Sequence, residues 1–331
     1  MKTVDGFSGA IGNTPLIRLS ALSAHVGREI FGKAEHLNPG GSVKDRAALG
    51  IVEDFEERGL LEPGGVVVEG TAGNTGIGLT LVGNARGYRT IIVMPDDQAP
   101  EKYDLLRTYG ADLRVVEAVP FTNDANYYHE ARRIAQSIPG AVWANQFENT
   151  VNRDTHERTT GPEILAQMDG KLDAFIAAAG TGGTLAGTGR ALKAHDPAIR
   201  VVLCDPYGSS LYNYVKAGKL EAEGDSSVEG IGIKRLTANF RNAPVDDAVR
   251  VDDRAMIEMA HWLLRETGFF LGGSAALNVV GAARYAATLP AGSRVVTVLC
   301  DGGDRYRSRI YDAAWLAENE LVPQAKDLSF L

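Results

Sequence analysis

Residues 65–81 read GVVVEGTAGNTGIGLTL, and this stretch contains the unit from which the fold is built. An uninterrupted apolar run at 66–68 leads into a glycine-rich loop at 70–76 and then into a segment with helical periodicity. Continuous apolar residues are typical of a strand that is covered on both faces of a parallel sheet. The stretch therefore predicts a strand, a tight loop and a helix that packs back on a sheet.

The same unit recurs along the chain. Short apolar runs predict strands at 65–69, 90–94, 113–116, 174–179, 200–204 and 294–299. Helical patterns alternate with them at 43–57, 75–86, 100–109, 124–137, 153–168, 184–194, 253–266 and 275–287. This alternation indicates an α/β fold of the doubly wound type.

Chain length and composition are those of a globular protein with more than one domain. At roughly 150 residues per domain, 331 residues predict about two domains. Hydrophobic residues make up 44% and charged residues 23%, which excludes wholesale disorder. The strands before and after about residue 150 predict two sheets, with a ligand in the crevice at the carboxyl ends of the strands.

Charge and cysteine usage narrow the class of protein. A net charge of −8 disfavours nonspecific nucleic-acid binding. No apolar run reaches the roughly 18 residues of a membrane span, and the N-terminal residues lack the pattern of a secretion signal. Two cysteines, Cys204 and Cys300, end apolar runs and fit buried thiols in a reducing compartment. We therefore expect a cytoplasmic protein without membrane or nucleic-acid partners.

The glycines concentrate between predicted strands and predicted helices, at 70–76, 180–184 and 272–276. A strand, a glycine turn and a helix N-terminus together present backbone N–H groups to an anion. No GxxxxGK[ST] motif occurs, and Leu185 stands where a dinucleotide site needs its third glycine. A small phosphate on 180–184 fits best, although each loop taken alone could be only a tight turn.

The segment NPGGSVKDR, at 38–46, is the most specific stretch. Turn residues lead to Ser42 as a predicted N-cap, with Lys44 in the first helical turn. The helix dipole disfavours a cation there, and a lysine in such a place suits chemistry with a carbonyl group. The alternative is an exposed lysine that pairs with Asp45 or Glu35.

A phosphate loop combined with a reactive lysine suggests pyridoxal 5'-phosphate as cofactor. With these residues in view, the chain resembles the β-replacement family of fold-type II pyridoxal-phosphate enzymes, which includes cysteine synthases and the catalytic core of cystathionine β-synthases. The matching segments are IGNTPL (11–16), KAEHLNPGGSVKDR (33–46), EGTAGNTGIGL (69–79), NQFEN (145–149), HERTTGPEI (156–164), GTGGT (180–184), EGIG (229–232), GGSAA (272–276) and CDGGDRY (300–306).

The resemblance implies two doubly wound subdomains of the tryptophan synthase β type, with the cofactor in the cleft between them. A catalytic unit at 1–321 would consist of a smaller mobile subdomain at about 45–149 and a larger one at about 1–44 plus 150–321. Residues 322–331 would form a C-terminal extension.

The resemblance also implies roles for the cofactor residues. Lys44 would hold the cofactor covalently and then act as the base at the substrate Cα. Asn74 would bind the ring hydroxyl oxygen, and Ser274 would lie at the pyridine nitrogen. The phosphate would be held by Gly180, Thr181, Gly182, Gly183 and Thr184, and no metal is implied.

The substrate carboxylate would lie in the loop after the first strand, with further contacts from the EGIG segment. The implied substrate residues are Thr71, Ala72, Gly73, Thr75, Gln146 and Gly230. The loop reads GTAGNTG where cysteine synthases usually have PTSGNTG, so Ala72 removes a hydroxyl and Gly70 replaces a rigid proline. These two positions put the substrate identity in question.

The activity that the resemblance favours is that of a cysteine synthase, which makes L-cysteine and acetate from O-acetyl-L-serine and sulfide. The alternatives in the same class are a cystathionine β-synthase-like enzyme that uses serine and a thiol, and a specialised synthase of β-substituted alanines. A nicotinamide-dependent dehydrogenase is disfavoured by Leu185, and the intact cofactor residues disfavour an idle partner-binding relative. The family also suggests a homodimer, with serine acetyltransferase as a candidate partner.

Overall fold

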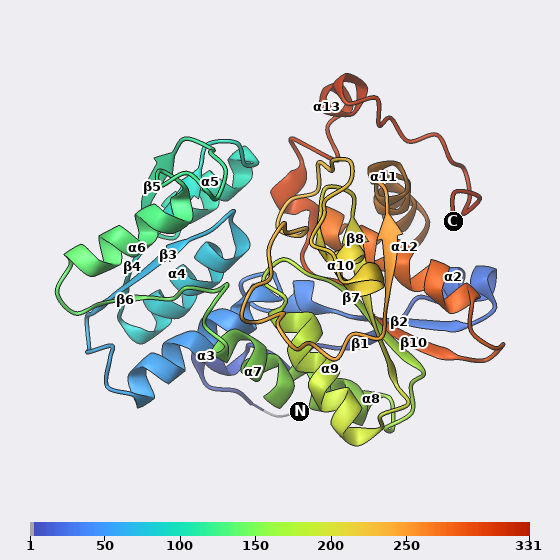
Figure 1. The fold of residues 1–331 in the computed structure, drawn as a ribbon, viewed down its shortest axis with the longest axis horizontal. Helices are drawn as coiled ribbons and strands as arrows, with labels where there is room; N and C mark the ends of the chain where they lie inside the picture. The colour runs from blue at the N-terminus through green and yellow to red at the C-terminus, as the bar shows by residue number, and fades with distance from the viewer. Residues whose placement is uncertain (1–2) are drawn as a thin grey trace.

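In the computed structural model, which describes residues 3–331, the apolar strands form two mostly parallel sheets, and each sheet lies in one of two adjoining lobes (Figure 1). The smaller sheet has the order β5-β4-β3-β6, with β5 (Asp112–Val116), β4 (Arg89–Pro95), β3 (Val66–Gly70) and β6 (Ala141–Trp143). The larger sheet has the order β1-β2-β10-β7-β8-β9, with β1 (Leu16–Arg18), β2 (Glu29–Lys33), β10 (Arg294–Val298), β7 (Ala174–Ala178), β8 (Arg200–Pro206) and β9 (Asp247–Val251). Within the described residues every strand pairing is parallel except that of β1 with β2.

The smaller sheet is covered on both faces. Its helices are α3 (Lys44–Glu57), α4 (Asn74–Arg86), α5 (Pro100–Thr108) and α6 (Tyr127–Ser137). Val67 packs with side chains of α3 and α4, whereas Val66 and Val68 pack with side chains of α6 on the opposite face. Because successive side chains of a strand point to opposite faces, burial on both sides requires the uninterrupted apolar run that the sequence shows.

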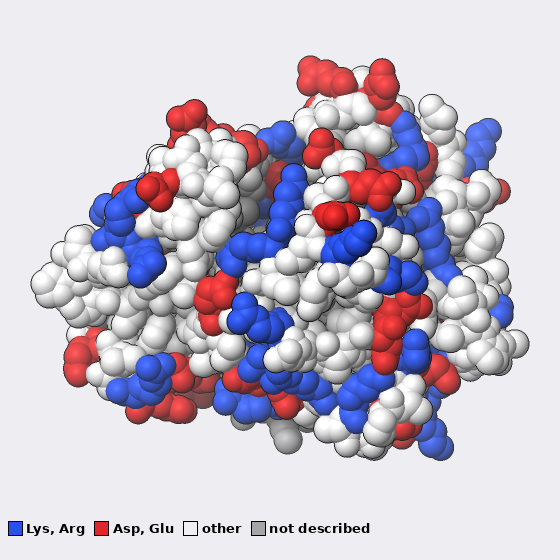
Figure 2. Space-filling view, in the orientation of Figure 1, with Lys and Arg blue, Asp and Glu red and all other residues white. Residues whose placement is uncertain are grey.

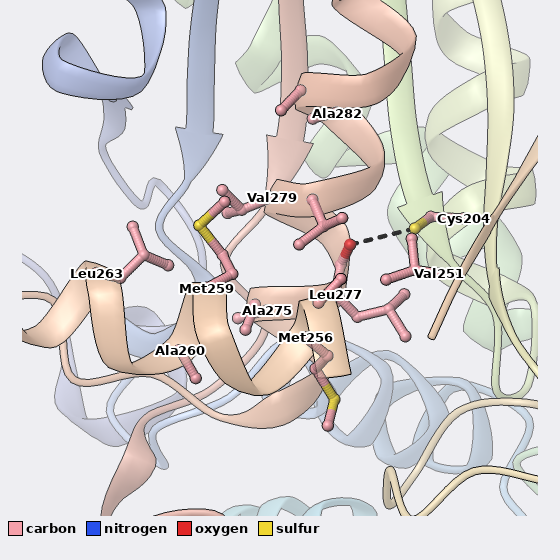
Figure 3. Close-up of a cluster of buried hydrophobic side chains, with 14 of the residues drawn as sticks. Cys204, Val251, Met256, Met259, Ala260, Leu263, Ala275, Leu277, Val279 and Ala282 are labelled. Atoms are coloured by element: carbon pink, nitrogen blue, oxygen red, sulfur yellow. Dashed lines mark hydrogen bonds between the residues drawn. The ribbon is translucent and has the colours of Figure 1, made fainter. Parts of the chain in front are cut away.

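The larger sheet is also sandwiched between helices. They are α2 (Ser20–Val26), α8 (Thr160–Gln167), α9 (Gly183–His195), α10 (Leu211–Ala217), α11 (Asp253–Trp262) and α12 (Gly273–Ala287). Side chains of α8, α9 and α10 fill the core on one face, and side chains of α2, α11 and α12 fill it on the other. Figure 3 shows the second core, where the buried thiol of Cys204 donates to the carbonyl oxygen of Leu277 at 3.3 Å.

The remaining elements are short. They are α1 (Gly6–Gly9), α7 (Val151–Arg158), α13 (Ala313–Glu318), 3₁₀ helices at Glu35–Leu37 and Gly303–Tyr306, and a π-helix at Leu263–Thr267 that continues α11. None of the helices among residues 3–331 has both the length and the apolar content that a membrane crossing requires.

Each predicted strand is present, and the differences concern short elements and boundaries. The sequence did not predict β1, β2, β6 and β9, which have three to five residues each. The helix predicted at 153–168 is two helices, α7 and α8, which meet at Thr159. The helix predicted from residue 124 begins at Tyr127, because the side chain of Asn126 caps it by accepting the Tyr128 N–H.

The four strands of the smaller sheet all lie between residues 66 and 143, and strands of the larger sheet lie on both sides of that segment. The subdomain limits at about 45, 149 and 321 stay a prediction. The segment after residue 321 contacts α11, because the Glu258 carboxylate accepts the N–H groups of Gln324 and Ala325 at 2.8 and 3.0 Å.

Candidate active site

A cavity of about 760 Å³ lies between the two lobes, where the glycine loops after β3 and β7 face each other. Figure 2 shows Lys and Arg side chains gathered along the groove between the lobes on one face of the molecule. Most of the residues predicted for the site line this cavity, namely Lys44, Thr71, Ala72, Gly73, Asn74, Thr75, Gln146, Gly180, Thr181, Gly182, Thr184, Gly230 and Ser274. The loops are therefore brought together as the sequence predicted.

Lys44 is the first residue of α3 and is half-buried in the cavity wall. The predicted cap is displaced by one residue, because the helix begins at Lys44 rather than at position 43. The hydroxyl of Ser42 still accepts the backbone N–H of Lys44 at 3.2 Å. The Asp45 carboxylate accepts the Gly40 N–H at 2.7 Å, and burial raises the pKa of Asp45 to about 7.

A cluster of buried ion pairs packs against the loop that precedes Lys44. Arg46 lies 2.7 Å from both Glu35 and Glu163, and Lys33 lies 2.6 Å from Glu163. Burial alone would raise the pKa of Glu163, but hydrogen bonds and charge from Arg46 lower it to about 2. Since Glu35 pairs with Arg46 and Asp45 binds Gly40, the alternative of an exposed Lys44 paired with either acid is wrong.

The loop at 180–184 forms a cradle at the N-terminus of α9. Gly182, the N-cap, has φ +87°, and a Cβ at Gly180 would lie 2.3 Å from the carbonyl oxygen of Gly230. Only glycine fits such a turn and such a close approach. Gly183 differs from its neighbours, because it lies outside the cavity wall, where a Cβ would lie 2.2 Å from Oδ1 of Asn152.

His156 is a buried residue whose role the sequence did not indicate. Its Nε2 lies 3.2 Å from the hydroxyl of Thr184, and its Nδ1 lies 2.8 Å from that of Thr160. Burial lowers the pKa of His156 to about 3, so the ring is neutral. It therefore orients the Thr184 hydroxyl without adding a charge beside the cradle.

The floor of the cavity is neutral. Ser274 lies in the first turn of α12 and is buried in the wall. Beside it, the Asn278 amide donates to the carbonyl of Val298 at 2.9 Å and to Cys300 Sγ at 3.3 Å. Burial raises the pKa of the Cys300 thiol to about 12. This surface presents a hydroxyl, an amide and a thiol to the cavity.

The loop at 71–75, which leads into α4, is held by Gln146. The Thr75 hydroxyl donates to Oε1 of Gln146 at 2.6 Å, and the Thr71 hydroxyl accepts the Gly73 N–H at 3.1 Å. Below them, the buried Glu69 accepts the backbone N–H of Gln146 at 3.4 Å, and burial raises the pKa of Glu69 to about 8. The loop therefore offers hydroxyl, amide and backbone donors over a carboxyl group that is protonated at neutral pH.

Gly70 and Ala72, the two positions that depart from the usual PTSGNTG sequence, have different surroundings. A Cβ at Gly70 would lie 2.7 Å from the carbonyl oxygen of Tyr127, at the start of α6. Ala72 lines the main cavity and also a second cavity of about 240 Å³. Gly70 therefore allows α6 to approach the loop, whereas Ala72 leaves open space.

Charged contacts join the lobes beside the cavity. The buried Lys102 of α5 pairs with Glu229, which is the only carboxylate in the cavity wall among residues 3–331. Arg235 pairs with Glu148, and its guanidinium lies 4.5 Å from the ring centroid of Phe121. The sequence did not reveal these contacts, because they join segments more than 80 residues apart.

The residues fit pyridoxal phosphate. The cradle at 180–184 suits a phosphate group because it combines glycine backbone, threonine hydroxyls and a helix N-terminus. Lys44 and Ser274 line the same cavity and provide an amine and a neutral hydroxyl.

Comparisons with known proteins find pyridoxal-phosphate-dependent enzymes that are similar to this chain over nearly its whole length. The family described as "Pyridoxal-phosphate dependent enzyme" matches residues 7–301. Cysteine synthase 1 of Neurospora crassa is 53% identical over 322 residues, which cover 96% of this chain and 86% of that protein. The solved O-acetylserine-dependent cystathionine beta-synthase of Helicobacter pylori has a TM-score of 0.86 at 33% identity, and the match covers 94% of this chain and 100% of that chain. The solved O-ureido-L-serine synthase has a TM-score of 0.86 at 34% identity, and the match covers 96% of this chain and 100% of that chain.

Proposed function

Since the chain belongs to the family of pyridoxal-phosphate-dependent enzymes, we propose that it is a cysteine synthase, which converts O-acetyl-L-serine and sulfide into L-cysteine and acetate. The observation that carries this proposal is the single cavity in which Lys44, the cradle at 180–184 and the loop at 71–75 meet. The similarity to a cysteine synthase over 96% of the chain supports the choice of reaction.

We propose that Lys44 binds the cofactor, that Asn74 and Ser274 contact its ring, and that Gly180, Thr181, Gly182 and Thr184 hold its phosphate at the N-terminus of α9. Gly183, which the sequence also assigned to the phosphate, lies outside the cavity wall and supports the turn instead, because its N–H donates to the Thr181 hydroxyl at 3.3 Å. When bound, the cofactor withdraws electrons from the substrate Cα and so acidifies its proton. The Lys44 amine would act as the base that removes the Cα proton of the substrate and holds it. Because Ser274 is a neutral hydroxyl, the protein supplies no carboxylate to keep a pyridine nitrogen protonated, which favours loss of a β-substituent over transamination.

We assign the substrate carboxylate to the loop at 71–75. The Thr71 hydroxyl and the backbone N–H of Ala72 are donors there, and the Thr75 hydroxyl and the Gly73 N–H become donors to the carboxylate when they leave Gln146 and Thr71. The Gln146 amide faces the loop, since it already contacts Thr75 at 2.6 Å. Gly230 completes this substrate set from the other lobe, next to Gly180.

We propose that the smaller lobe, at about 45–149, closes on the larger one when substrate binds. Contacts such as Lys102 with Glu229 support this, because they form only when the lobes adjoin. Closure excludes water, which would otherwise divert the reaction to pyruvate and ammonia.

A first experiment tests the cofactor assignment. Purified protein should be yellow, and borohydride should attach the cofactor irreversibly to the peptide that contains Lys44, as seen by mass spectrometry. The Lys44→Ala protein should show neither the attachment nor the synthase activity. Full activity of a colourless Lys44→Ala protein would overturn the mechanism.

A second experiment tests the substrate. The enzyme is mixed separately with O-acetylserine, O-phosphoserine and serine, and the visible spectrum and cysteine formation are recorded. We expect a response to O-acetylserine. A response to serine alone would favour the second candidate, a cystathionine β-synthase-like activity, which the similarity to the Helicobacter pylori enzyme supports.

We further propose that the protein is a cytoplasmic homodimer and that serine acetyltransferase is a candidate partner. The free thiols Cys204 and Cys300 support a reducing compartment. Light scattering measures the oligomeric state, cell fractionation tests the location, and co-elution with purified serine acetyltransferase tests the partner. A monomer, a secreted protein or separate elution would each contradict the corresponding proposal.

A further inference from the structure

The amide of Asn74, at the start of α4, contacts two residues of the CDGGDRY segment from the opposite lobe. Its Nδ2 donates to Oδ2 of Asp301 at 2.6 Å, and its Oδ1 accepts from Nη1 of Arg305 at 2.5 Å. We propose that Asp301 and Arg305 are positioning residues that fix the orientation of the Asn74 amide toward the ring of the cofactor. This inference rests on the proposed function, because it assumes that Asn74 binds the cofactor.

The two partners define the amide orientation without ambiguity. A guanidinium only donates hydrogen bonds and an ionised carboxylate only accepts them, so Arg305 must face the amide oxygen and Asp301 must face the amide nitrogen. One N–H of Asn74 is used by Asp301, and its second N–H stays free to donate. Asn74 also lines the cavity, so that N–H can serve an acceptor on a bound ring.

The Asp301 carboxylate is itself held in place. It is fully buried, and its Oδ2 also accepts the hydroxyl of Tyr306 at 2.6 Å. Gly272 donates its N–H to the Asp301 carbonyl at 3.0 Å, and a Cβ at Gly272 would lie 2.3 Å from Oδ1 of Asp301. The first glycine of the GGSAA segment therefore makes room for this carboxylate.

The Arg305 guanidinium is held in place by the loop that precedes Lys44. Arg305 is buried, and its Nη2 donates to the carbonyl of Gly40. A Cβ at Gly41 would lie 2.8 Å from the same nitrogen. One arginine therefore connects the loop that precedes Lys44 to the amide of Asn74. Loss of either partner would remove one of the two restraints on the amide, so that it more often turns its oxygen toward the oxygen of the ring, which is repulsive.

The test is a double-mutant cycle on the holoenzyme. Asp301→Leu removes the acceptor at similar size, and Asp301→Asn keeps an oxygen in the same place. Each is combined with wild-type Asn74 and with Asn74→Ala, and cofactor dissociation is followed by visible absorbance during dialysis. Thermal unfolding is recorded for every protein.

We expect Asp301→Leu to weaken cofactor retention about tenfold, since one well-placed hydrogen bond is worth up to about that factor. In the Asn74→Ala background the same substitution should change retention less than twofold. Asp301→Asn should restore most of the retention. Arg307→Met, which removes an exposed charge two residues from Arg305, is the matched control and should leave retention unchanged.

Equal losses in both backgrounds would show that Asp301 stabilises the fold only, and would overturn the proposal. If Asp301→Leu does not fold, Arg305→Lys takes its place in the double-mutant cycle. The single ammonium of a lysine cannot reach both Gly40 and Asn74. Equal losses of cofactor retention with and without Asn74→Ala would again overturn the proposal. Attachment of the cofactor to Lys44 by borohydride in the wild type separates the proposed function from the positioning role of Asp301 and Arg305. If it is absent, the proposed function fails, and if it is present while the cycle is additive, only the positioning role fails.

Discussion

Burial sets the charge of several single residues around the cavity. Glu69 and His156 are both fully enclosed, and the environment keeps each in its neutral form near pH 7. Asp45 has its pKa raised to about 7 and so titrates in the same range. The free-energy cost of burying a charge explains all three shifts, since it favours the protonated acid and the unprotonated imidazole.

Glu69→Gln should change how stability depends on pH. The pKa of Glu69 rises from 4.5 unfolded to about 8 folded, so its carboxyl favours the folded state fully below about pH 4.5. That contribution is lost as pH rises toward 8. We expect the variant, which cannot ionise, to gain stability relative to wild type between pH 5 and 8, by a few kcal/mol at most. Urea unfolding at several pH values measures this, and parallel curves for the two proteins would contradict it.

Gly70→Pro restores the residue that cysteine synthases usually have, yet it should destabilise this protein. The new ring atoms would meet the carbonyl oxygen of Tyr127, which lies 2.7 Å from the position of a Cβ. We expect a loss of about 1–3 kcal/mol in the free energy of unfolding, as for overpacked cores. Ala72→Ser is the control, since it faces open cavity and should leave stability within about 0.5 kcal/mol. Equal stability of Gly70→Pro and wild type would show that α6 moves freely.

At the scale of elements, the sequence predicts what is local and misses what depends on distant partners. The strands at 66–70 and 174–178 were predicted because burial on both faces leaves a continuous apolar run. Strand β1 is antiparallel to β2 at the sheet edge and has only three residues, so no local pattern marks it. Likewise the cradle at 180–184 follows from glycine spacing, whereas Asp301 and Arg305 reach Asn74 only through the fold.

A side chain at Gly182, the N-cap of α9, should destabilise the N-terminus of this helix. Gly182→Ala would place a Cβ 2.6 Å from that of Phe240, at a φ of +87° that alanine disfavours. We expect a loss of about 1–3 kcal/mol in stability and weaker cofactor retention, because the cradle must open. Thermal unfolding and absorbance during dialysis measure the two effects. Gly218→Ala is a control with a similar φ of +72° at a helix C-cap and no atom within 4 Å, so a loss of the same size there would assign the effect to backbone strain alone.

At the scale of the molecule, we expect activity to depend on contacts between the lobes. Lys102→Met should loosen closure, because it removes the contact of Lys102 with Glu229 across the lobes and leaves Glu229 only Arg309, at 3.8 Å. We expect more pyruvate per cysteine formed, by a factor of about two to ten, since water reaches the site before sulfide does. Arg107→Met on the same helix removes an exposed pair with Asp104 and should not change the ratio. An unchanged ratio in Lys102→Met would contradict a role in closure.

The order of the larger sheet also has a consequence for synthesis of the chain on the ribosome. Strand β2 pairs with β10, so one of the earliest strands must wait for one of the last to emerge. The smaller sheet is complete once residue 143 has left the exit tunnel. We therefore expect the smaller lobe to fold first during translation, while β1 and β2 stay unpaired with the rest of their sheet. Ribosome-bound chains stalled before residue 294 should resist protease between about residues 45 and 149 but not at residues 16–33, and protection of residues 16–33 at that stage would contradict this order.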